Sequence, residues 1–255
     1  MTSEPVSPDS DQAPHLSRED GADLIVQALH HLRRSLERDG DSYWKTASSR
    51  QEDCLKGWSE DLGLSLAAGS FLNKFERGGQ EHDIFVEEKA DRYFKLTRNG
   101  VFGFTPGIEI ALVSSAEDGR RFHLWEASPY LYLERLHLQN TTLTPQLNRL
   151  EGIVFQKGDV SILTSQPRLP LNAVTQGEID EWFSSMGFER IAEAAYYRKE
   201  DNLGVFDAHD KNVVRAGDTL VPFDVIPCHP EEGFLEFIES TLSTGHTLTA
   251  IRSTT

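Results

Sequence analysis

The chain has little cysteine and no long hydrophobic run. Its only two cysteines, Cys54 and Cys228, occur in 255 residues, and their spacing matches no metal-ligand pattern. So few thiols favour a reducing compartment, and we expect a cytoplasmic protein. No apolar stretch approaches the roughly 18 residues of a membrane-spanning helix, and the polar, acidic segment 1–20 does not resemble a signal peptide. The sequence therefore predicts no membrane partner.

Basic residues are also scarce, with 25 Lys and Arg against 41 Asp and Glu, which gives a formal net charge of −16. Such a charge argues against a nucleic-acid groove or an anionic membrane surface as the main partner. The hydrophobic content of 38% and the charged content of 26% are typical of a globular protein. At this length the chain can bury one substantial core, or one domain with appendages.

Hydrophobic spacing divides the chain into three parts. Residues 1–16 are rich in Ser, Pro, Asp and Glu, and we predict a disordered tail. Residues 17–76 form an N-terminal helical segment, with helices predicted from Ser17 to about Arg38 and from Ser49 to Leu62. Residues 77–255 form a compact domain that mixes strands and helices, so the fold class is α+β.

Within that domain, local patterns predict the following elements. A hairpin follows the pair Gly78–Gly79, and Ser128–Pro129 opens a helix because Ser suits the N-cap and Pro the first turn. The predicted ranges are a hairpin at 84–86 and 93–96, strands at 108–113 and 121–125, a helix at 129–139, strands at 150–155 and 160–164, a helix at 175–186, and a hairpin at 196–197 and 205–206.

Two short apolar segments near the C-terminal end, residues 205–214 and 220–226, each deliver an acidic residue to a loop. Asp207 follows the first strand, Asn212 comes five residues later, and Asp224 lies among apolar neighbours in the second. A kinase-type site needs this layout, with one Asp at the acceptor hydroxyl and an Asn and a second Asp on metal. The Asp-x4-Asn pair alone is weak evidence. A charge at Asp224, however, needs a metal, a cation or protonation.

A phosphate-binding cation is the other requirement of such a site. Lys95 lies inside an apolar strand after Gly78–Gly79, and glycines let backbone N–H groups approach phosphate. The alternative is a lysine on the solvent face of a half-exposed strand. A buried lysine needs an acid, and Glu134 is the best candidate because it interrupts the apolar face of the 129–139 helix. Alternatively, Glu134 pairs with a neighbouring residue on the same helix or faces water.

Three further residues have local explanations as well as functional ones. Glu81 and His82 directly follow the glycines, where they either order the loop or point into a nucleotide site. His209 is expected to hold Asp207 by a hydrogen bond rather than to transfer a proton. For Asp207 itself, a turn role after a strand is the simpler alternative.

Short matching stretches in one order make the chain resemble the kinase-like domain of phage and mobile-element polyvalent proteins, a compact, divergent relative of Ser/Thr/Tyr protein kinases. The resemblance covers about Leu55–Pro227. The stretches lie at residues 55–58, 78–85, 94–97 with 100 and 102–103, 132–136 with 138–140, 149–152, 164–167, 178–182 with 187–188, 206–209 with 212, and 222–227.

The resemblance implies a protein-kinase-like fold, with a strand-rich N-lobe preceded by helices and a reduced C-lobe, and it implies ATP and Mg²⁺ as cofactors. Asp207 and Lys95 would be catalytic, and Asn212 and Asp224 would bind the metal. Residues 164–167 would link two lobes next to adenine. Together with the residues argued above from local patterns, the expected cofactor-binding residues are Gly78, Gly79, Lys95, Glu134, Ser165 and Gln166.

Departures from the kinase pattern leave alternatives open. There is no complete Gly-x-Gly-x-x-Gly, no His-Arg-Asp, Val225-Ile226 replaces Phe-Gly, and 31 residues follow Asp224. We expect an ATP–Mg²⁺-dependent phosphotransferase whose acceptor, a protein or a small molecule, is unknown. The alternative is a pseudokinase or an acidic protein–protein interaction module without turnover. We also predict that Asp224→Ala removes magnesium-dependent nucleotide binding and leaves the fold intact or makes it more stable, because a carboxylate among apolar neighbours is costly without a metal.

Overall fold

The computed structural model describes residues 20–37, 48–67, 69–108, 121–145, 147–156, 158–170, 172–245 and 249–251. The predicted tail at residues 1–16 and the predicted helix start at Ser17 lie outside these residues. The helices are α1 Gly21–Glu37, α2 Ser48–Asp61, α3 Pro129–Leu138, α4 Gln176–Ser185 and α5 Glu232–Thr244, with shorter helical turns η1 Ser70–Lys74 and η2 Gln139–Leu143.

A six-stranded sheet forms one side of the molecule, in the order β1-β7-β8-β4-β3-β2. β1 pairs with β7 in parallel, and every other neighbour is antiparallel. The predicted hairpin is confirmed as β3 and β4, with Ile84 opposite Lys95. The strands are β1 Ser65–Ala67, β2 Glu76–Arg77, β3 His82–Glu87, β4 Arg92–Thr97, β7 Arg149–Gln156 and β8 Asp159–Pro167.

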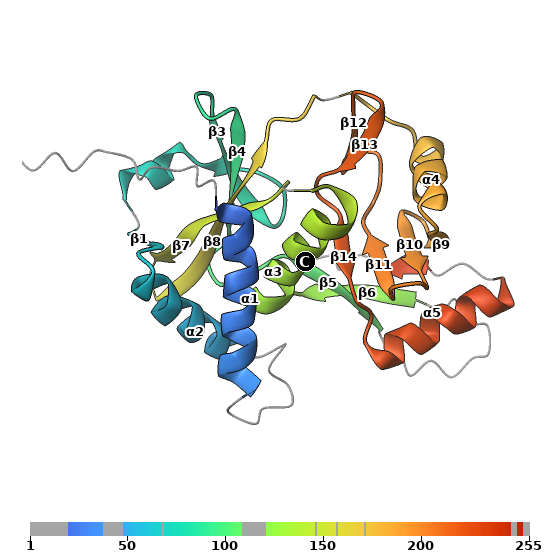
Figure 1. Ribbon diagram of the computed structural model, residues 1–255, viewed down its shortest axis with the longest axis horizontal. Coiled ribbons are helices and arrows are strands. Elements are labelled where there is room, and N and C mark those ends of the chain that lie inside the picture. The colour runs from blue at the N-terminus through green and yellow to red at the C-terminus, as the bar shows by residue number, and fades with distance from the viewer. Residues whose placement is uncertain are drawn as a thin grey trace, which may run out of the picture.

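The helices of the N-terminal segment pack against this sheet together with α3 (Figure 1). The apolar stripe of α1, with Ile25, Ala28 and Leu32 fully buried, shares one core cluster with Leu133 of α3 and Ile153 of β7. A helix of 17 residues needs such a partner, because tertiary packing of an apolar face supplies most helical stability. Helices α1 and α2 and the sheet therefore share a hydrophobic core.

The other side of the molecule holds three smaller sheets, with α4 and α5 beside them (Figure 1). Their orders are β14-β11-β10-β9, β12-β13, and β15-β6-β5. The predicted hairpin at residues 196–206 is confirmed, with Tyr196 opposite Val205. The strands are β5 Phe104–Ile108, β6 Arg121–Glu126, β9 Glu189–Ala192, β10 Ala195–Arg198, β11 Leu203–Phe206, β12 Val213–Ala216, β13 Thr219–Pro222, β14 Ile226–Cys228 and β15 Thr249–Ile251.

The mixture of helices and mainly antiparallel sheets confirms the α+β class. The predicted strand at 108–113 lies outside the described residues from position 109 on. Within the described residues, β5 runs from Phe104 to Ile108 and pairs with β6 over its whole length, including Pro106 and Gly107.

Helix α3 occupies the middle of the molecule, between the two groups of sheets (Figure 1). It begins as predicted: Ser128 accepts a hydrogen bond from the backbone N of Leu131, and Pro129 takes the first helical position. The helix contacts α1 on one side and β14 on the other. Side chains of α3 can therefore reach elements from both groups of sheets.

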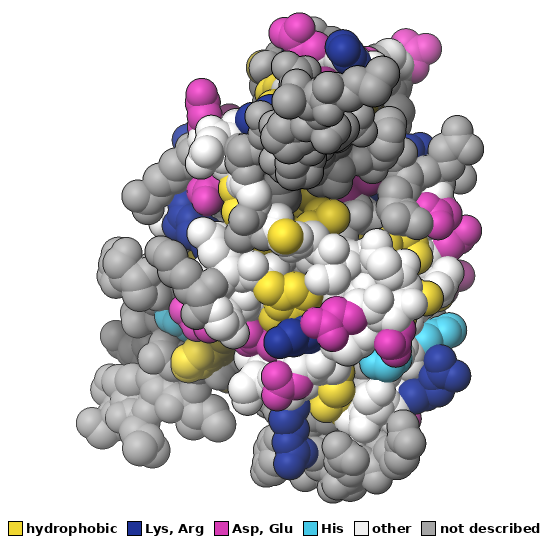
Figure 2. Space-filling model, turned by 90° about the vertical axis from the view of Figure 1, so that its left-hand side faces the viewer, with side chains coloured by type: hydrophobic (Ala, Val, Ile, Leu, Met, Phe, Trp, Pro, Cys, Tyr) yellow, Lys and Arg dark blue, Asp and Glu magenta, His cyan; other side chains and the backbone are white. Residues whose placement is uncertain are grey.

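No helix among the described residues is long and apolar enough to cross a lipid bilayer. On the face drawn in Figure 2, hydrophobic side chains lie in small groups separated by acidic, basic and neutral polar side chains. Isolated apolar side chains are normal on a protein surface. That face offers no argument for a particular partner.

Candidate functional site

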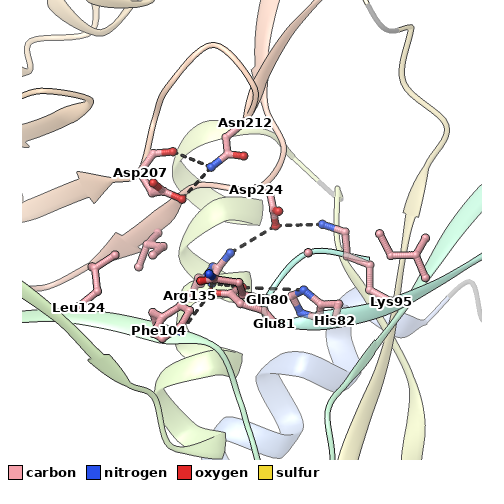
Figure 3. Close-up of a pocket in the computed structure, with 13 residues that line it drawn as sticks. Gln80, Glu81, His82, Lys95, Phe104, Leu124, Arg135, Asp207, Asn212 and Asp224 are labelled. Carbon is pink, nitrogen blue, oxygen red and sulfur yellow. Dashed lines mark hydrogen bonds and ion pairs between the residues drawn. The ribbon is translucent and has the colours of Figure 1, made fainter. Parts of the chain in front are cut away.

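A cavity of about 260 Å³ lies where the β3–β4 hairpin, helix α3 and the loops beside β11, β13 and β14 meet (Figure 3). The structure places Lys95, Asp207, Asn212 and Asp224 around it. These residues come from three separate segments of the chain: β4, the β11–β12 loop and the β13–β14 connection. The other lining residues are Gly79, Gln80, Glu81, His82, Ile84, Phe104, Leu124, Arg135 and Ile226.

Asn212 joins the two segments that carry the acids. Asp207 directly follows β11 and has a left-handed backbone (φ 56°), which Asp tolerates better than most residues. The Nδ2 of Asn212 donates to the backbone oxygen of Asp207 at 2.8 Å and to its Oδ2 at 2.9 Å. The backbone oxygen of Asn212 accepts from the N–H groups of Phe223 (3.0 Å) and Asp224 (3.4 Å). The spacing of Asn212 thus has a structural cause as well as a chemical one.

Buried side chains also fix the backbone on both sides of Asp224. Each donates to a carbonyl of that segment: Gln139 to Pro222 (2.6 Å), Gln166 to Phe223 (2.9 Å) and Arg135 to Val225 (3.0 Å). Unmade hydrogen bonds of buried groups are costly, so these contacts hold the segment in one conformation. The position of the Asp224 side chain follows from them.

Two cations contact the Asp224 carboxylate. Lys95 Nζ lies 3.0 Å from Oδ1, and Arg135 Nη2 lies 3.4 Å from the same oxygen. Burial alone would raise the pKa of Asp224, but the charges of Lys95 and Arg135 outweigh it and hold that pKa well below its usual range. The sequence required a metal, a cation or protonation at this carboxylate, and the structure shows two cations. The carboxylate is therefore compensated without a metal, contrary to the assumption behind the Asp224→Ala prediction. The contact between Arg135 and Asp224 spans 89 positions, so no local pattern pairs these two residues.

Glu81 is the second acid at the cavity. Both of its carboxylate oxygens accept from Arg135 Nη1, at 3.0 and 2.9 Å, and Oε1 also accepts from the backbone N of Phe104 at 3.1 Å. Glu81 and Asp224 thus alternate with Arg135 and Lys95, so the four charges compensate one another. Such compensation is what allows charged groups to lie in a largely buried site.

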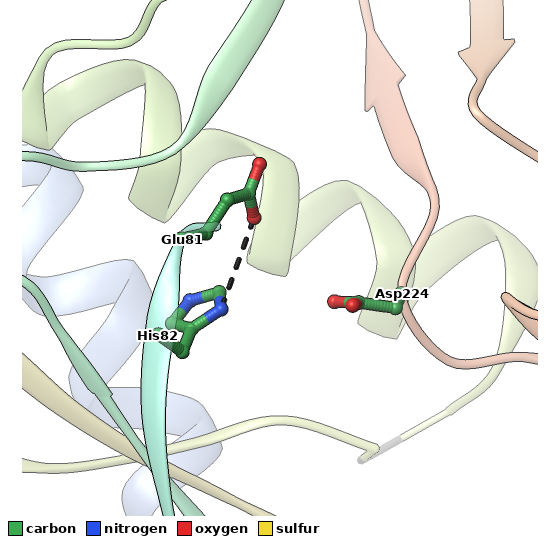
Figure 4. Close-up of side chains that lie close together, drawn as sticks. All are labelled: Glu81, His82 and Asp224. Atoms are coloured by element: carbon green, nitrogen blue, oxygen red, sulfur yellow. Dashed lines mark ion pairs between the residues drawn. The ribbon is translucent and has the colours of Figure 1, made fainter. Parts of the chain in front are cut away.

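His82 lies beside Glu81 but is uncharged at neutral pH (Figure 4). Burial, with the positive charges of Lys95 and Arg135, lowers the pKa of His82 to about 3. Its Nε2 shares a hydrogen bond of 3.0 Å with the hydroxyl of Tyr132 in α3. The 3.8 Å approach of its Nδ1 to Glu81 is therefore a dipolar contact, and His82 connects β3 to α3.

Two sets of groups could hold a cation. Ligand atoms of Glu81, His82 and Asp224 lie within 4.8 Å of one another, but Lys95 and Arg135 already occupy that position, and Mg²⁺ prefers oxygen to imidazole. The second set fits better. Lys95 and Arg135 both contact Asp224 Oδ1, which leaves Oδ2 for a metal, and the contacts of Asn212 with Asp207 use its Nδ2, which leaves its Oδ1. Both are hard oxygen ligands.

Glu134 is not the partner of Lys95, so the alternative expected for it, a neighbour on its own helix, is the one that the structure shows. Its Oε1 accepts from the Tyr130 hydroxyl at 3.2 Å, and it lines a separate cavity on the other side of α3. The reason is helical geometry, since each residue is rotated by about 100° from the one before. The next residue, Arg135, faces the site instead.

Of the other predicted cofactor-binding residues, Gly79 and Gln166 line a cavity, whereas Gly78 and Ser165 do not. Gly79 lines the main cavity, whereas Gly78 forms the turn behind it, where an added Cβ would lie 2.7 Å from the side chain of Ile84. Gln166 lines an adjoining apolar cavity of about 130 Å³. Ser165 does not line either cavity: strand side chains alternate, and Ser165 faces Glu151 and Arg92 instead.

The functional candidates that sequence analysis missed are Arg135 and Gln139. Both are almost fully buried, and they are spaced i, i+4 on a helix that is otherwise apolar on its inner face. Polar residues at that spacing share one face, so the signal was present. The acids and carbonyls that they contact are 54 to 90 positions away, and no local pattern identifies them.

Residues 122–227 match the family model described as Serine/Threonine/Tyrosine Kinase found in polyvalent proteins. The match confirms the kinase-like resemblance over less than half of the chain. It includes Arg135, Asp207, Asn212 and Asp224, and it does not reach Gly79 or Lys95. No curated protein and no solved structure gives a significant match to the chain.

Proposed function

We propose that this protein is an ATP–Mg²⁺-dependent phosphotransferase of divergent protein-kinase type. One observation carries the proposal: Lys95, Asp207, Asn212 and Asp224 line a single cavity, although Lys95 and Asp224 are 129 positions apart. Phosphoryl transfer depends mainly on positioning and on charge compensation. A lysine, an acceptor-side acid and two metal ligands in one cavity are the parts that this chemistry needs.

The nucleotide is proposed to occupy both cavities. Lys95 and Ile84 line the main cavity and the smaller apolar one, so the two adjoin. The smaller cavity offers an apolar slot for a purine base between Val214, Phe223 and Tyr93. The phosphates would then extend toward Lys95 and the backbone of Gly79.

The proposed metal ligands are the oxygens of Asp224 and Asn212 that the contacts described above do not use. Asp224 Oδ2 and Asn212 Oδ1 would hold Mg²⁺, which neutralises charge on the transferred phosphoryl group. Asp207 would orient the acceptor hydroxyl and take its proton. Its Oδ2 accepts from Asn212, so this hydrogen bond fixes the direction of the carboxylate.

Nucleotide binding without turnover, as in a pseudokinase, is the second candidate. The direct 3.0 Å contact between Lys95 and Asp224 favours it, because both charges are satisfied without a ligand. In a turnover cycle this contact has to open each time nucleotide and metal bind.

Titration calorimetry with ATP, with and without Mg²⁺, followed by incubation with γ-labelled ATP, separates the candidates. Magnesium-dependent binding together with label transfer to water, to the protein itself or to an added acceptor supports a phosphotransferase. Binding with no transfer to any acceptor supports the second candidate. No binding at all refutes both.

A further inference from the structure

Arg135 connects helix α3 to three other parts of the chain around the cavity (Figure 3). The residue is 5% exposed, and its three nitrogens face three different parts of the chain. Nη1 donates to both oxygens of Glu81, Nε donates to the backbone of Val225 at 3.0 Å, and Nη2 approaches Asp224 Oδ1 at 3.4 Å. A planar guanidinium with several fixed partners has essentially one available orientation.

Two further contacts, with Phe104 and Gly103, fix the position of Glu81. Its Oε1 accepts from the backbone of Phe104, and a Cβ on Gly103 (φ +78°) would lie 2.9 Å from the carboxylate. The acid therefore fits closely against a glycine that cannot be replaced without displacing it. This packing fixes Glu81, and Glu81 in turn fixes Arg135.

Lys95 approaches the same oxygen of Asp224 in a different way. Its Nζ, at the end of a flexible stem, donates a hydrogen bond to Asp224, and the ammonium group also lies 5.8 Å from the ring of Phe223. A lysine with one such contact can transfer its charge to a phosphate at little geometric cost. Arg135 cannot leave, because Glu81 and Val225 retain it.

We propose that Arg135 is a positioning residue for the metal site: it holds Oδ1 of Asp224 so that Oδ2 faces the cavity when Lys95 has moved to phosphate. The inference rests on the proposed function. It assigns to helix α3 a cation where Glu134 was expected to act as an acid. It also gives Glu81 a defined task, which is to orient Arg135 rather than to bind metal.

The test is the Mg²⁺ dependence of ATP binding in Arg135→Lys, measured by calorimetry at fixed nucleotide. The variant keeps a positive charge but loses the fork that reaches Glu81, Val225 and Asp224 together. We expect the Mg²⁺ concentration at half-saturation to rise by about 10- to 100-fold, the usual effect of losing a residue that orients a metal ligand. ATP affinity without metal should stay close to that of the wild type.

Arg92→Lys is the matched control. Arg92 is also a buried arginine, but it donates to the side chain and backbone of Ser165, away from Asp224. Its replacement should lower the melting temperature without changing the Mg²⁺ dependence. Glu81→Gln, which keeps the shape of the side chain, provides a second variant if Arg135→Lys does not fold, and it should shift the Mg²⁺ dependence in the same direction.

Three results would overturn the inference. The first is an unchanged Mg²⁺ dependence in Arg135→Lys, or in Glu81→Gln where only that variant folds. The second is an equal loss of ATP binding with and without metal, which indicates a general structural role. The third is a wild-type protein that binds no ATP with Mg²⁺. That result refutes the proposed function as well and is recognised before any substitution is made.

Discussion

Lys95 donates to Oδ1 of Asp224 at 3.0 Å across 129 positions of the sequence. The charges of these two side chains therefore compensate each other when no ligand is bound. The lysine side chain is 10% exposed and the aspartate side chain 36% exposed, so the pair lies at the wall of the cavity rather than in the core. A nucleotide phosphate and a metal would each replace one member of the pair. Binding of the two ligands should therefore be mutually dependent.

The first prediction concerns Lys95→Met. Loss of a charged hydrogen bond to phosphate should weaken ATP–Mg²⁺ binding by about 10- to 100-fold. The same substitution removes one of the two positive charges beside Asp224, so the variant should bind Mn²⁺ without nucleotide more tightly than the wild type does. Calorimetry with each ligand alone and with both measures the two effects, and Lys89→Met, an exposed lysine in the β3–β4 turn, is the control. Weaker binding of Mn²⁺ alone would contradict the proposed exchange.

The second prediction concerns Asp207→Asn, which keeps the shape of the side chain and removes its basicity. The rate of transfer from γ-labelled ATP should fall by about 10²- to 10⁴-fold, while ATP–Mg²⁺ binding is retained. Asp210→Asn is the matched control, since its side chain is 61% exposed and does not line the cavity. Equal rates in Asp207→Asn and the wild type would remove Asp207 from the reaction.

The fold was predictable where periodicity is local. Helices α2 and α3 and both hairpins follow from apolar spacing, capping and turn residues. The structure of segment 220–226 was not predictable in this way. Its sequence resembles one apolar strand, whereas in the structure β13 ends at Pro222 and β14 begins at Ile226. β13 pairs with β12 and β14 pairs with β11. Long-range pairing decides where such a strand divides, and a single sequence does not show it.

The sequence predicted which kinds of charged group the candidate site contains, but not every residue that provides them. Asp224 in an apolar segment required a partner, which sequence reasoning expected to be a metal or a cation. The structure provides Lys95 and Arg135, and the second of these was overlooked in favour of its neighbour Glu134. One helical position changes the direction of a side chain by about 100°. Predicting which of the two faces the cavity requires the packing of α3 between α1 and β14.

The third prediction concerns the stability of Asp224→Asn. Because the folded-state pKa of Asp224 is depressed, its charge stabilises the protein above its ordinary pKa, and that stabilisation is lost as pH falls through the folded value. At pH 7 the variant should be less stable than the wild type by about 1 kcal/mol, a figure reduced for partial exposure. The difference should shrink below about pH 4.

Chemical denaturation at pH 7 and at the lowest pH where both forms fold measures this difference. Asp210→Asn again serves as the control, because its carboxylate is largely exposed. An Asp224→Asn protein that is more stable than the wild type at pH 7 would mean that desolvation of the carboxylate outweighs its two cations. The interpretation of Lys95 and Arg135 as compensating partners would then be wrong.

The last prediction concerns His82 and mild acid. Its pKa is about 3 in the folded protein against an ordinary value of 6.5, so between these values the unfolded chain binds one proton more than the folded one. Stability should therefore fall as pH decreases through this window, by about 1.4 kcal/mol per pH unit from His82 alone. In His82→Gln, which can still accept a hydrogen bond from Tyr132, that contribution should be absent.

Urea denaturation between pH 6 and pH 4.5 tests this, because Asp224 contributes only below that range. His31 and His137 also have lowered pKa values because of burial, but they are present in both proteins and cancel in the difference. The slope of unfolding free energy against pH should be smaller in His82→Gln by the amount for one proton. If the two slopes are equal, His82 accepts a proton in the folded protein as readily as in the unfolded chain. The neutral contact between β3 and Tyr132 of α3 would then not exist in solution.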